Sequence, residues 1–371
     1  KRVMVTKTLI IFLLFCFAFT RNGFTQLMNY PKMPDDNTIL FIGEAHRIKE
    51  NAPVQLDLIK HYIENNTYNS IILERCGSFQ VIIDNIIKNR DTTNMYLIDP
   101  VVLCNIEDCE HDFKSGSDFI IQLTDFAREK NVPIYCFDAE IDYTKTKKIL
   151  ISIIDTSYTS KKNDVFQKLR DTDANLSIYK ELLALYDTKN KWKKNISESA
   201  YSYIEKVITN VYLQSKETHY MGLRENYLYN QFNKLLKSNK GLKPIAVYGL
   251  AHTHKHYDPE VTELTRPMYQ SVAAYLNEDE KSACKDKAAS IALTYFFNSG
   301  EDSTFTYFGY FETEDLKVLK DSLGNQKYFI SKASEISISP YLQKAFDYVI
   351  SINDCHKLFE HTNIYLKPRR H

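Results

Sequence analysis

The stretch Thr38-Ile-Leu-Phe-Ile-Gly-Glu-Ala-His46 places an acid and an imidazole directly after a short apolar run. Residues 39–42 are all apolar, and a run of this length is typical of a buried β-strand. The run ends at Gly43, and Glu44 and His46 follow at once. The stretch therefore predicts a strand that carries two reactive side chains at its carboxyl end.

A second stretch, far downstream, has the same form. Residues 244–248 are a short apolar run that ends in Gly249-Leu-Ala-His252, so the motif Gly-x-x-His occurs twice, each time after a predicted strand. Two further runs end in an acid, residues 70–73 at Glu74 and residues 134–137 at Asp138.

The order of the predicted elements favours a parallel sheet. Helical periodicity covers residues 54–63, 79–87 and 118–129, so strands and helices alternate as in βαβ units. In an open parallel α/β sheet, ligands bind beyond the carboxyl ends of the strands. We therefore expect one site that contains Glu44, His46, Glu74, Asp138 and His252. The alternative is that each strand ends in a polar residue only because it reaches solvent there.

Residues 143–217 have a different character. Lys, Asn and Asp are dense, Gly and Pro are absent, and Leu, Ile and Tyr recur at helical spacing. This pattern predicts an all-helical insertion, in which we expect Trp192 to cover apolar surface rather than to contact a ligand. The predicted fold class is α/β, with a mainly parallel central sheet flanked by helices. Residues 27–371 are expected to form a single domain that carries this insertion.

Arg224 lies near the start of a predicted helix over residues 221–236, on the flank of its apolar face. From there a guanidinium can reach the crevice as a clamp for an anion or a transition state. The alternative is a surface arginine paired with a residue one turn away.

His252, His254 and His256 alternate, so on an extended segment their side chains point the same way. One interpretation places only His252 in the site and leaves the other two solvated. If His254 does reach the site, we expect it to bind substrate together with Asp138. The other interpretation is a divalent metal site whose ligands are Glu44, His46, His252 and His254.

The beginning of the sequence has the features of a targeting segment. Lys1, Arg2 and Lys7 precede an apolar run over residues 9–19 that is short for a membrane span. We predict a secretory signal peptide over residues 1–26, export to the periplasm or beyond the cell, and no stable membrane insertion after cleavage. A retained anchor is the alternative. In an oxidising compartment, Cys104 and Cys109 are the expected disulfide pair.

Composition and motif searches exclude several classes. Lys plus Arg and Asp plus Glu each number 47, and no basic stripe favours nucleic acid as a partner. The sequence contains no Walker loop, no Gly-x-Gly-x-x-Gly and no Gly-x-Ser-x-Gly elbow. We therefore expect a small-molecule or peptide substrate and no nucleotide cofactor.

The ordered motifs resemble the erythromycin esterase and ChaN-like superfamily, which also includes the Tiki-type metallopeptidases. The matching residues are Gly43-Glu44-Ala45-His46, Glu74, Arg224 and Gly249-Leu-Ala-His252, within residues 38–256. The resemblance implies an α/β fold and, often, hydrolysis, although some relatives bind haem or iron. Macrolide esterases typically have Gly-Glu-Ala-Thr-His-Gly and a final His-Asn. This chain lacks that threonine and has His252-Thr253, so macrolide hydrolysis is not implied.

The function expected from these residues is a secreted hydrolase of an ester, lactone or amide bond that activates water without a cofactor. His46 is the expected general base, because the pKa of histidine normally lies near neutral pH. Glu44 or Glu74 would orient His46, and His252 with Arg224 would stabilise the oxyanion. The alternatives are metal-dependent hydrolysis at the same site and a non-catalytic haem- or iron-binding protein.

Overall fold

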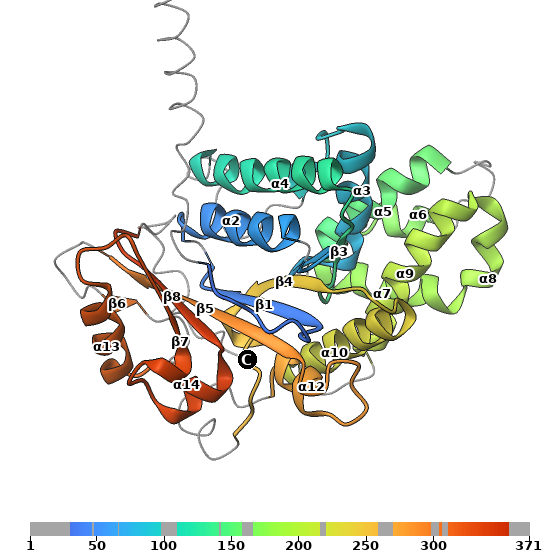
Figure 1. Ribbon diagram of the computed structural model, residues 1–371. Helices are drawn as coiled ribbons and strands as arrows, with labels where there is room; N and C mark the ends of the chain where they lie inside the picture. Colours follow the sequence, from blue (N-terminus) through green and yellow to red (C-terminus); the bar gives the residue numbers. More distant parts are fainter. Residues whose placement is uncertain are drawn as a thin grey trace, which may run out of the picture.

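A single mixed sheet forms the centre of the molecule (Figure 1). It is seen in a computed structural model that describes residues 30–46, 48–65, 67–97, 110–140, 142–157, 166–215, 220–258, 270–297, 304–305 and 311–355. Within these residues the sheet has eight strands: β1 (Ile39–Glu44), β2 (Ser70–Leu73), β3 (Ile134–Cys136), β4 (Pro244–Gly249), β5 (Ala288–Phe296), β6 (Thr304–Phe305), β7 (Tyr328–Lys332) and β8 (Tyr348–Ile352).

The strand order is β3-β2-β4-β1-β5-β8-β7, and β6 pairs with β5. All neighbours from β3 to β8 are parallel, whereas β7 and β6 pair antiparallel with their neighbours. The four strands predicted to carry reactive residues are therefore parallel neighbours, which confirms the predicted mainly parallel sheet. The sequence analysis did not identify β7, whose residues are only half-buried and have little apolar periodicity.

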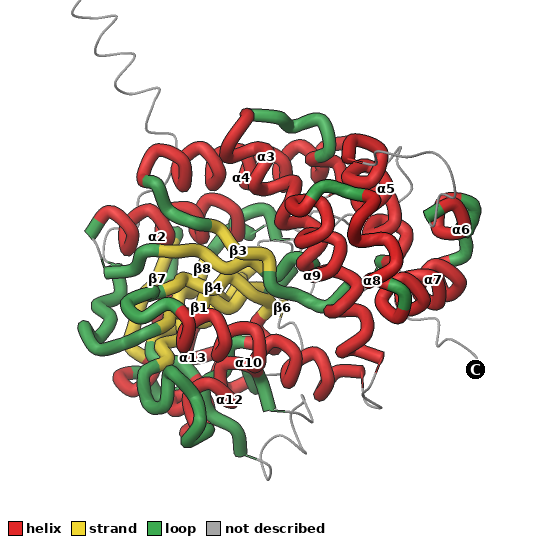
Figure 2. The backbone as a smooth tube through the Cα atoms, turned by 90° about the vertical axis from the view of Figure 1, so that its right-hand side faces the viewer, coloured by secondary structure: helices red, strands yellow, loops and turns green. Residues whose placement is uncertain are grey.

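Helices cover both faces of the sheet (Figures 1 and 2). On one face, α2 (Asn51–Glu64), α3 (Gln80–Asn89) and α4 (Glu110–Lys130) enclose a core that includes Leu40 and Ile42 of β1. On the other face, α10 (Tyr220–Ser238) and α12 (Val272–Glu278) pack over Ile39 and Phe41. A further core on β5 and β8 is covered by α13 (Thr313–Leu323) and α14 (Pro340–Ala345).

The start of α4 is the main difference from the predicted helices. Periodicity indicated a helix only from residue 118, after a loop over residues 91–114, but α4 begins at Glu110. Its first two turns read Glu-His-Asp-Phe-Lys-Ser-Gly-Ser, which has no apolar stripe. A method that depends on apolar spacing cannot detect a polar stretch of helix.

The predicted insertion is helical throughout its described part, which confirms that element of the fold. It consists of α5 (Tyr143–Ser157), α6 (Gln167–Arg170), α7 (Asn175–Asp187), α8 (Lys189–Trp192) and α9 (Glu198–Ser215). These helices gather at one end of the sheet (Figure 2) and have a hydrophobic core of their own. Trp192 is completely buried in that core, and its indole N–H donates to the carbonyl of Leu185 at 3.1 Å.

A buried carboxyl group joins the insertion to the sheet. Glu140, four residues after β3, is 1% exposed. Its side chain accepts hydrogen bonds from the amide and hydroxyl of Ser78 at 2.8 and 2.9 Å, and from the hydroxyl of Thr146 in α5 at 2.8 Å. The first helix of the insertion is thereby fixed beside the end of β2.

β3 is an edge strand, and a glutamine side chain covers its outer edge. The amide of Gln80 donates to the carbonyl of Ile134 and accepts from the amide N–H of Cys136, both at 2.8 Å. The side chain thus makes the two hydrogen bonds that a neighbouring strand would make. Edge strands need such protection because their free backbone groups pair readily with another chain.

Several predictions concern residues outside the described part. The signal peptide and the Cys104–Cys109 disulfide fall there and stay predictions. Within the part of the chain that the structure describes, no helix combines the length and apolar character needed to cross a membrane.

Candidate active site

Glu74, which follows β2, is the centre of the candidate site, and its side chain is 7% exposed. Its Oε1 accepts a hydrogen bond from Arg224 Nη2 and lies 3.5 Å from His252 Nε2. Its Oε2 accepts from the backbone N–H of Gly249 at 2.5 Å and lies 4.0 Å from His46 Nε2. One carboxylate therefore contacts groups that follow β1 and β4, although these lie about two hundred residues apart in sequence.

His46 is the most open side chain of the cluster, at 44% exposed. Its Nδ1 lies 2.6 Å from Glu44 Oε1. Asn51 of α2 donates to the other oxygen of Glu44, and Tyr295 of β5 donates to the amide oxygen of Asn51. When the imidazole is neutral, this arrangement places its proton on Nδ1 and leaves Nε2 as the basic atom.

His252 forms a second pair of the same kind. It is the last residue of the short helix η5 (Leu250–His252), and its side chain is 4% exposed. Its Nδ1 is hydrogen-bonded to Glu225 of α10, a residue with no exposed surface. The other oxygen of Glu225 accepts the amide N–H of Val272, at 2.6 Å, where α12 begins. Both histidines therefore have a carboxylate at Nδ1 and direct Nε2 toward Glu74.

Arg224 lies between two acids. Its Nε and Nη2 donate to the carboxylate of Asp138 at 2.7 and 2.8 Å, and Nη2 also donates to Glu74. The arginine is therefore not the surface residue of the alternative interpretation. Asp138 is 5% exposed and is occupied by Arg224 and by the amide N–H of Ala139. Its predicted contact with substrate stays a prediction.

The glycines of both Gly-x-x-His motifs allow close approach of neighbouring groups. A Cβ at Gly249 would lie 3.0 Å from His46 Nε2 and 3.4 Å from Glu74 Oε2. A Cβ at Gly43 would lie 2.2 Å from the hydroxyl oxygen of Thr253. A side chain at either position would therefore displace the groups that follow the other strand.

The charges of the cluster shift its pKa values in opposite directions. Desolvation lowers the pKa of His46, but the carboxylates of Glu44 and Glu74 outweigh it and raise the pKa to about 9. Burial alone would raise the pKa of Glu74, but Arg224, His252 and His46 hold it well below its usual range. Displaced pKa values of neighbouring groups are a property that catalytic sites often share.

The alternating histidines do not lie as predicted. The segment is not extended, because His252 ends a helical turn and Thr253 follows it with helical backbone angles. His254 is fully buried, and desolvation together with the charges of His252 and His256 lowers its pKa to about 3. His256 instead pairs with Glu278 at 2.8 Å. The role of His254 in substrate binding stays a prediction, although no open surface supports it.

The residues predicted as metal ligands are only partly suited to bind a metal ion. Imidazoles whose Nδ1 is held by a carboxylate are common metal ligands, and His46 and His252 both have this form. Among the described residues, however, no group of three or more His, Cys, Asp or Glu side chains has an arrangement that would hold a metal ion. Metal binding and haem binding both stay predictions.

The sequence analysis missed three residues of the cluster: Asn51, Glu225 and Tyr295. Glu225 directly follows the predicted Arg224, and one signal was available, a second charged residue at the start of an apolar helix face. Asn51 is hydrogen-bonded to Glu44, Tyr295 is hydrogen-bonded to Asn51, and neither residue belongs to a sequence motif. Their positions depend on α2 and β5 meeting beside β1, which residue spacing does not reveal.

No family model matches the chain, and no curated protein sequence does. Solved structures do match. A variant of erythromycin esterase EreC in its open conformation superposes with a TM-score of 0.53 at 15% sequence identity, covering 87% of this chain and 92% of that chain. The chain has the erythromycin esterase fold.

Two other solved structures share the erythromycin esterase fold with this chain. One is a protein from Bacillus cereus, with a TM-score of 0.52, 13% identity, and coverage of 88% of this chain and 91% of that chain. The other is a succinoglycan biosynthesis protein, with a TM-score of 0.50, 12% identity, and coverage of 86% and 88%. The resemblance predicted from the motifs is thus confirmed at the level of the fold.

Proposed function

We propose that the chain is a hydrolase that uses water to cleave an ester, lactone or amide bond of a small molecule or peptide. The observation that carries the proposal is the convergence of two histidine–carboxylate pairs on Glu74. Two imidazoles with fixed tautomers and one shared carboxylate supply the proton transfers that such a reaction needs. The erythromycin esterase fold supports hydrolysis at a general level. We also propose export, on the basis of the apolar run at residues 9–19.

His46 is the proposed general base, since it is the most open imidazole of the cluster. Its Nε2 takes a proton from water as the water oxygen bonds to the substrate carbonyl carbon. The imidazolium then returns the proton to the leaving oxygen or nitrogen as the bond to the carbonyl carbon breaks. Glu44 stabilises the imidazolium through Nδ1, as the acid of a catalytic triad does.

The pKa of His46 changes one expectation. A pKa near neutral pH was expected, but a pKa of about 9 leaves only roughly one molecule in a hundred with a neutral His46 at pH 7. The proposed base is therefore most effective at alkaline pH.

Arg224 and His252 take different roles in this proposal. The Nε and Nη2 of Arg224 are occupied by Asp138 and Glu74, so the proposed role of the arginine is to position Glu74. The Nε2 of His252 faces Glu74 from the other side. In the imidazolium form, which carries a proton on both nitrogens, this Nε2 is the proposed donor to the oxyanion.

The test is a screen of chromogenic esters, lactones and amides, followed by kinetics of two histidine variants. His46→Gln is expected to lower kcat/KM by at least ~10²-fold, as loss of a general base does. His256→Gln is the matched control, because His256 also pairs with an acid but lies outside the cluster. Equal activity of the wild type and His46→Gln on a substrate found in the screen would remove this mechanism.

The second candidate is metal-dependent hydrolysis at the same residues, which the carboxylate-held imidazoles favour. A bound divalent ion would lower the pKa of its water and so supply the nucleophile. The ligands predicted from the sequence are Glu44, His46, His252 and His254, although His254 is fully buried. Elemental analysis of protein purified without added metal decides between the two: a stoichiometric metal, together with loss of activity on chelation, favours this version.

A further inference from the structure

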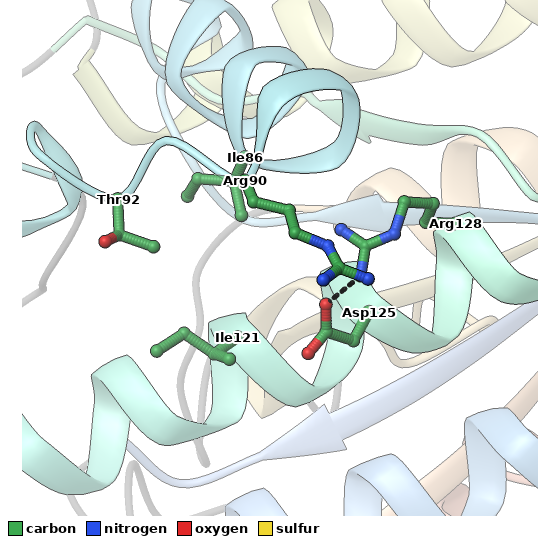
Figure 3. Close-up of a pocket in the computed structure, with 6 residues that line it drawn as sticks. All are labelled: Ile86, Arg90, Thr92, Ile121, Asp125 and Arg128. Carbon is green, nitrogen blue, oxygen red and sulfur yellow. Dashed lines mark hydrogen bonds and ion pairs between the residues drawn. The ribbon is translucent and has the colours of Figure 1, made fainter.

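A small cavity of about 220 Å³ lies between the end of α3 and the second half of α4. It is lined by Ile86, Arg90, Thr92, Ile121, Asp125 and Arg128. Figure 3 shows the side chains of Arg90 and Arg128 pointing toward one another, with the hydrogen bond between Arg128 and Asp125 as a dashed line. The two isoleucines provide an apolar wall.

The charges that line this cavity do not balance. Asp125 accepts a hydrogen bond from Arg128 Nη2 and neutralises one of the two guanidinium groups. In the part of the chain that the structure describes, Arg128 Nη1 is buried without a hydrogen-bond partner, whereas Arg90 and Asp125 are exposed. Buried donors are normally satisfied, and this nitrogen of Arg128 is not. An anion in the cavity would accept from Arg128 Nη1 and gain a second charged donor from Arg90.

The cavity is separate from the candidate active site. α4 ends at Lys130, shortly before β3 begins at Ile134, so Arg128 lies toward the amino end of β3. Glu74 and Asp138 instead follow the carboxyl ends of β2 and β3. A ligand in the cavity therefore does not compete with the substrate for Glu74.

We propose that this cavity binds a small oxyanion, a carboxylate or phosphate group carried by a small molecule. The guanidinium groups of Arg90 and Arg128 bind its oxygens, since planar guanidinium donors match both groups geometrically. Ile86 and Ile121 contact the apolar part of the molecule that carries it. This site is independent of the proposed hydrolysis.

The experiment is calorimetric titration of the full chain with inorganic phosphate, acetate and hexanoate. Arg90→Gln and Arg128→Gln are each expected to weaken binding about tenfold or more, because a hydrogen-bonded charge contributes roughly that factor. Asp125→Asn is expected to tighten binding, because it removes the competing carboxylate. Hexanoate binding more tightly than acetate assigns the site to an apolar carboxylate, whereas phosphate binding most tightly assigns it to a phosphate ligand.

The matched control is Arg170→Gln, which removes an arginine that also pairs with one aspartate, Asp155, but lines no part of this cavity. Thermal unfolding of each variant verifies that it is folded. The proposal is overturned if no anion binds the wild type at millimolar concentration. It is equally overturned if Asp125→Asn binds no more tightly than the wild type, or if Arg170→Gln weakens binding as much as Arg90→Gln.

Discussion

Glu44 sets the pH at which His46 becomes neutral. Desolvation lowers the pKa of His46, and the charge and hydrogen bond of Glu44 are the largest effects that raise it. Glu44→Gln keeps a side chain of the same size but removes the charge. The variant is therefore expected to lower the pKa of His46 and to move the acid limb of the kcat/KM profile to lower pH, from about pH 9 in the wild type.

The measurement is kcat/KM against pH for the two proteins on one substrate. Glu278→Gln is the control, since it removes an acid from Nδ1 of His256, outside the cluster. An acid limb that stays at the same pH in Glu44→Gln would show that His46 is not the titrating base.

At this scale the sequence predicted which residues converge, but not how they are connected. His46, Glu74 and His252 were predictable because each follows a strand end, and parallel strands bring their carboxyl ends together. Arg224 was predictable from its place near the start of a helix, on the flank of the apolar face. Glu225 and Asn51 were not, because their contacts depend on how α10 and α2 pack. The pKa of His46 was not predictable either, since it depends on two carboxylates within 4.0 Å.

At the scale of single elements, the edge of β3 depends on one side chain. Gln80→Ala would leave the carbonyl of Ile134 and the amide of Cys136 without their partner. Each buried unsatisfied backbone group costs about 1–3 kcal/mol. We therefore expect Gln80→Ala to lower the free energy of unfolding by about 2 kcal/mol or more, as measured by urea denaturation.

Gln167→Ala is the matched control, because Gln167 is exposed and its side-chain amide donates to Asp171 one turn away. Substitution at such a surface position normally changes stability by less than about 0.5 kcal/mol. Equal losses in the two variants would mean that Gln80 does not protect the edge.

The sequence predicted helices correctly where apolar residues form a stripe along one face, as in α2 and α10. The polar first turns of α4 and the half-buried β7 were missed because neither has such a stripe. The sequence predicted that the insertion is helical, but not which of its helices pack together. Periodicity shows which face of a helix is buried, and it does not show which helix covers that face.

At the scale of the whole molecule, buried titratable groups set how stability depends on pH. Burial lowers the pKa of His254 to about 3, below its unfolded value of 6.5. The unfolded chain therefore binds a proton that the folded chain does not, and stability falls as pH drops from 6.5 toward 3. Burial raises the pKa of Glu140 to about 7 despite its hydrogen bonds from Thr146 and Ser78. The contribution of Glu140 to the stability of the fold is present below the unfolded pKa of 4.5 and is lost as pH rises through 7.

These two groups oppose one another between pH 4.5 and pH 6.5, so a variant is needed to separate them. His254→Gln removes the titration of His254 and leaves Glu140 in place. The difference in Tm between His254→Gln and the wild type is expected to shift in favour of the variant as pH falls through this window. Thermal unfolding of both proteins at several pH values measures this difference. A constant difference in Tm across the window would show that His254 is not buried in its neutral form.

The separate core of the helical insertion has a consequence for how such a protein can diversify. Helices α5–α9 bury their apolar residues mainly against one another, whereas the sheet is packed by α2, α3, α4, α10 and α12. Substitutions in distant, non-contacting clusters have nearly additive effects. A lineage can therefore remodel the insertion through many generations while selection on the sheet edge stays unchanged. The insertion and the sheet edge then evolve as two modules of one chain, and the hydrogen bond from Thr146 to Glu140 is one of the contacts that join them.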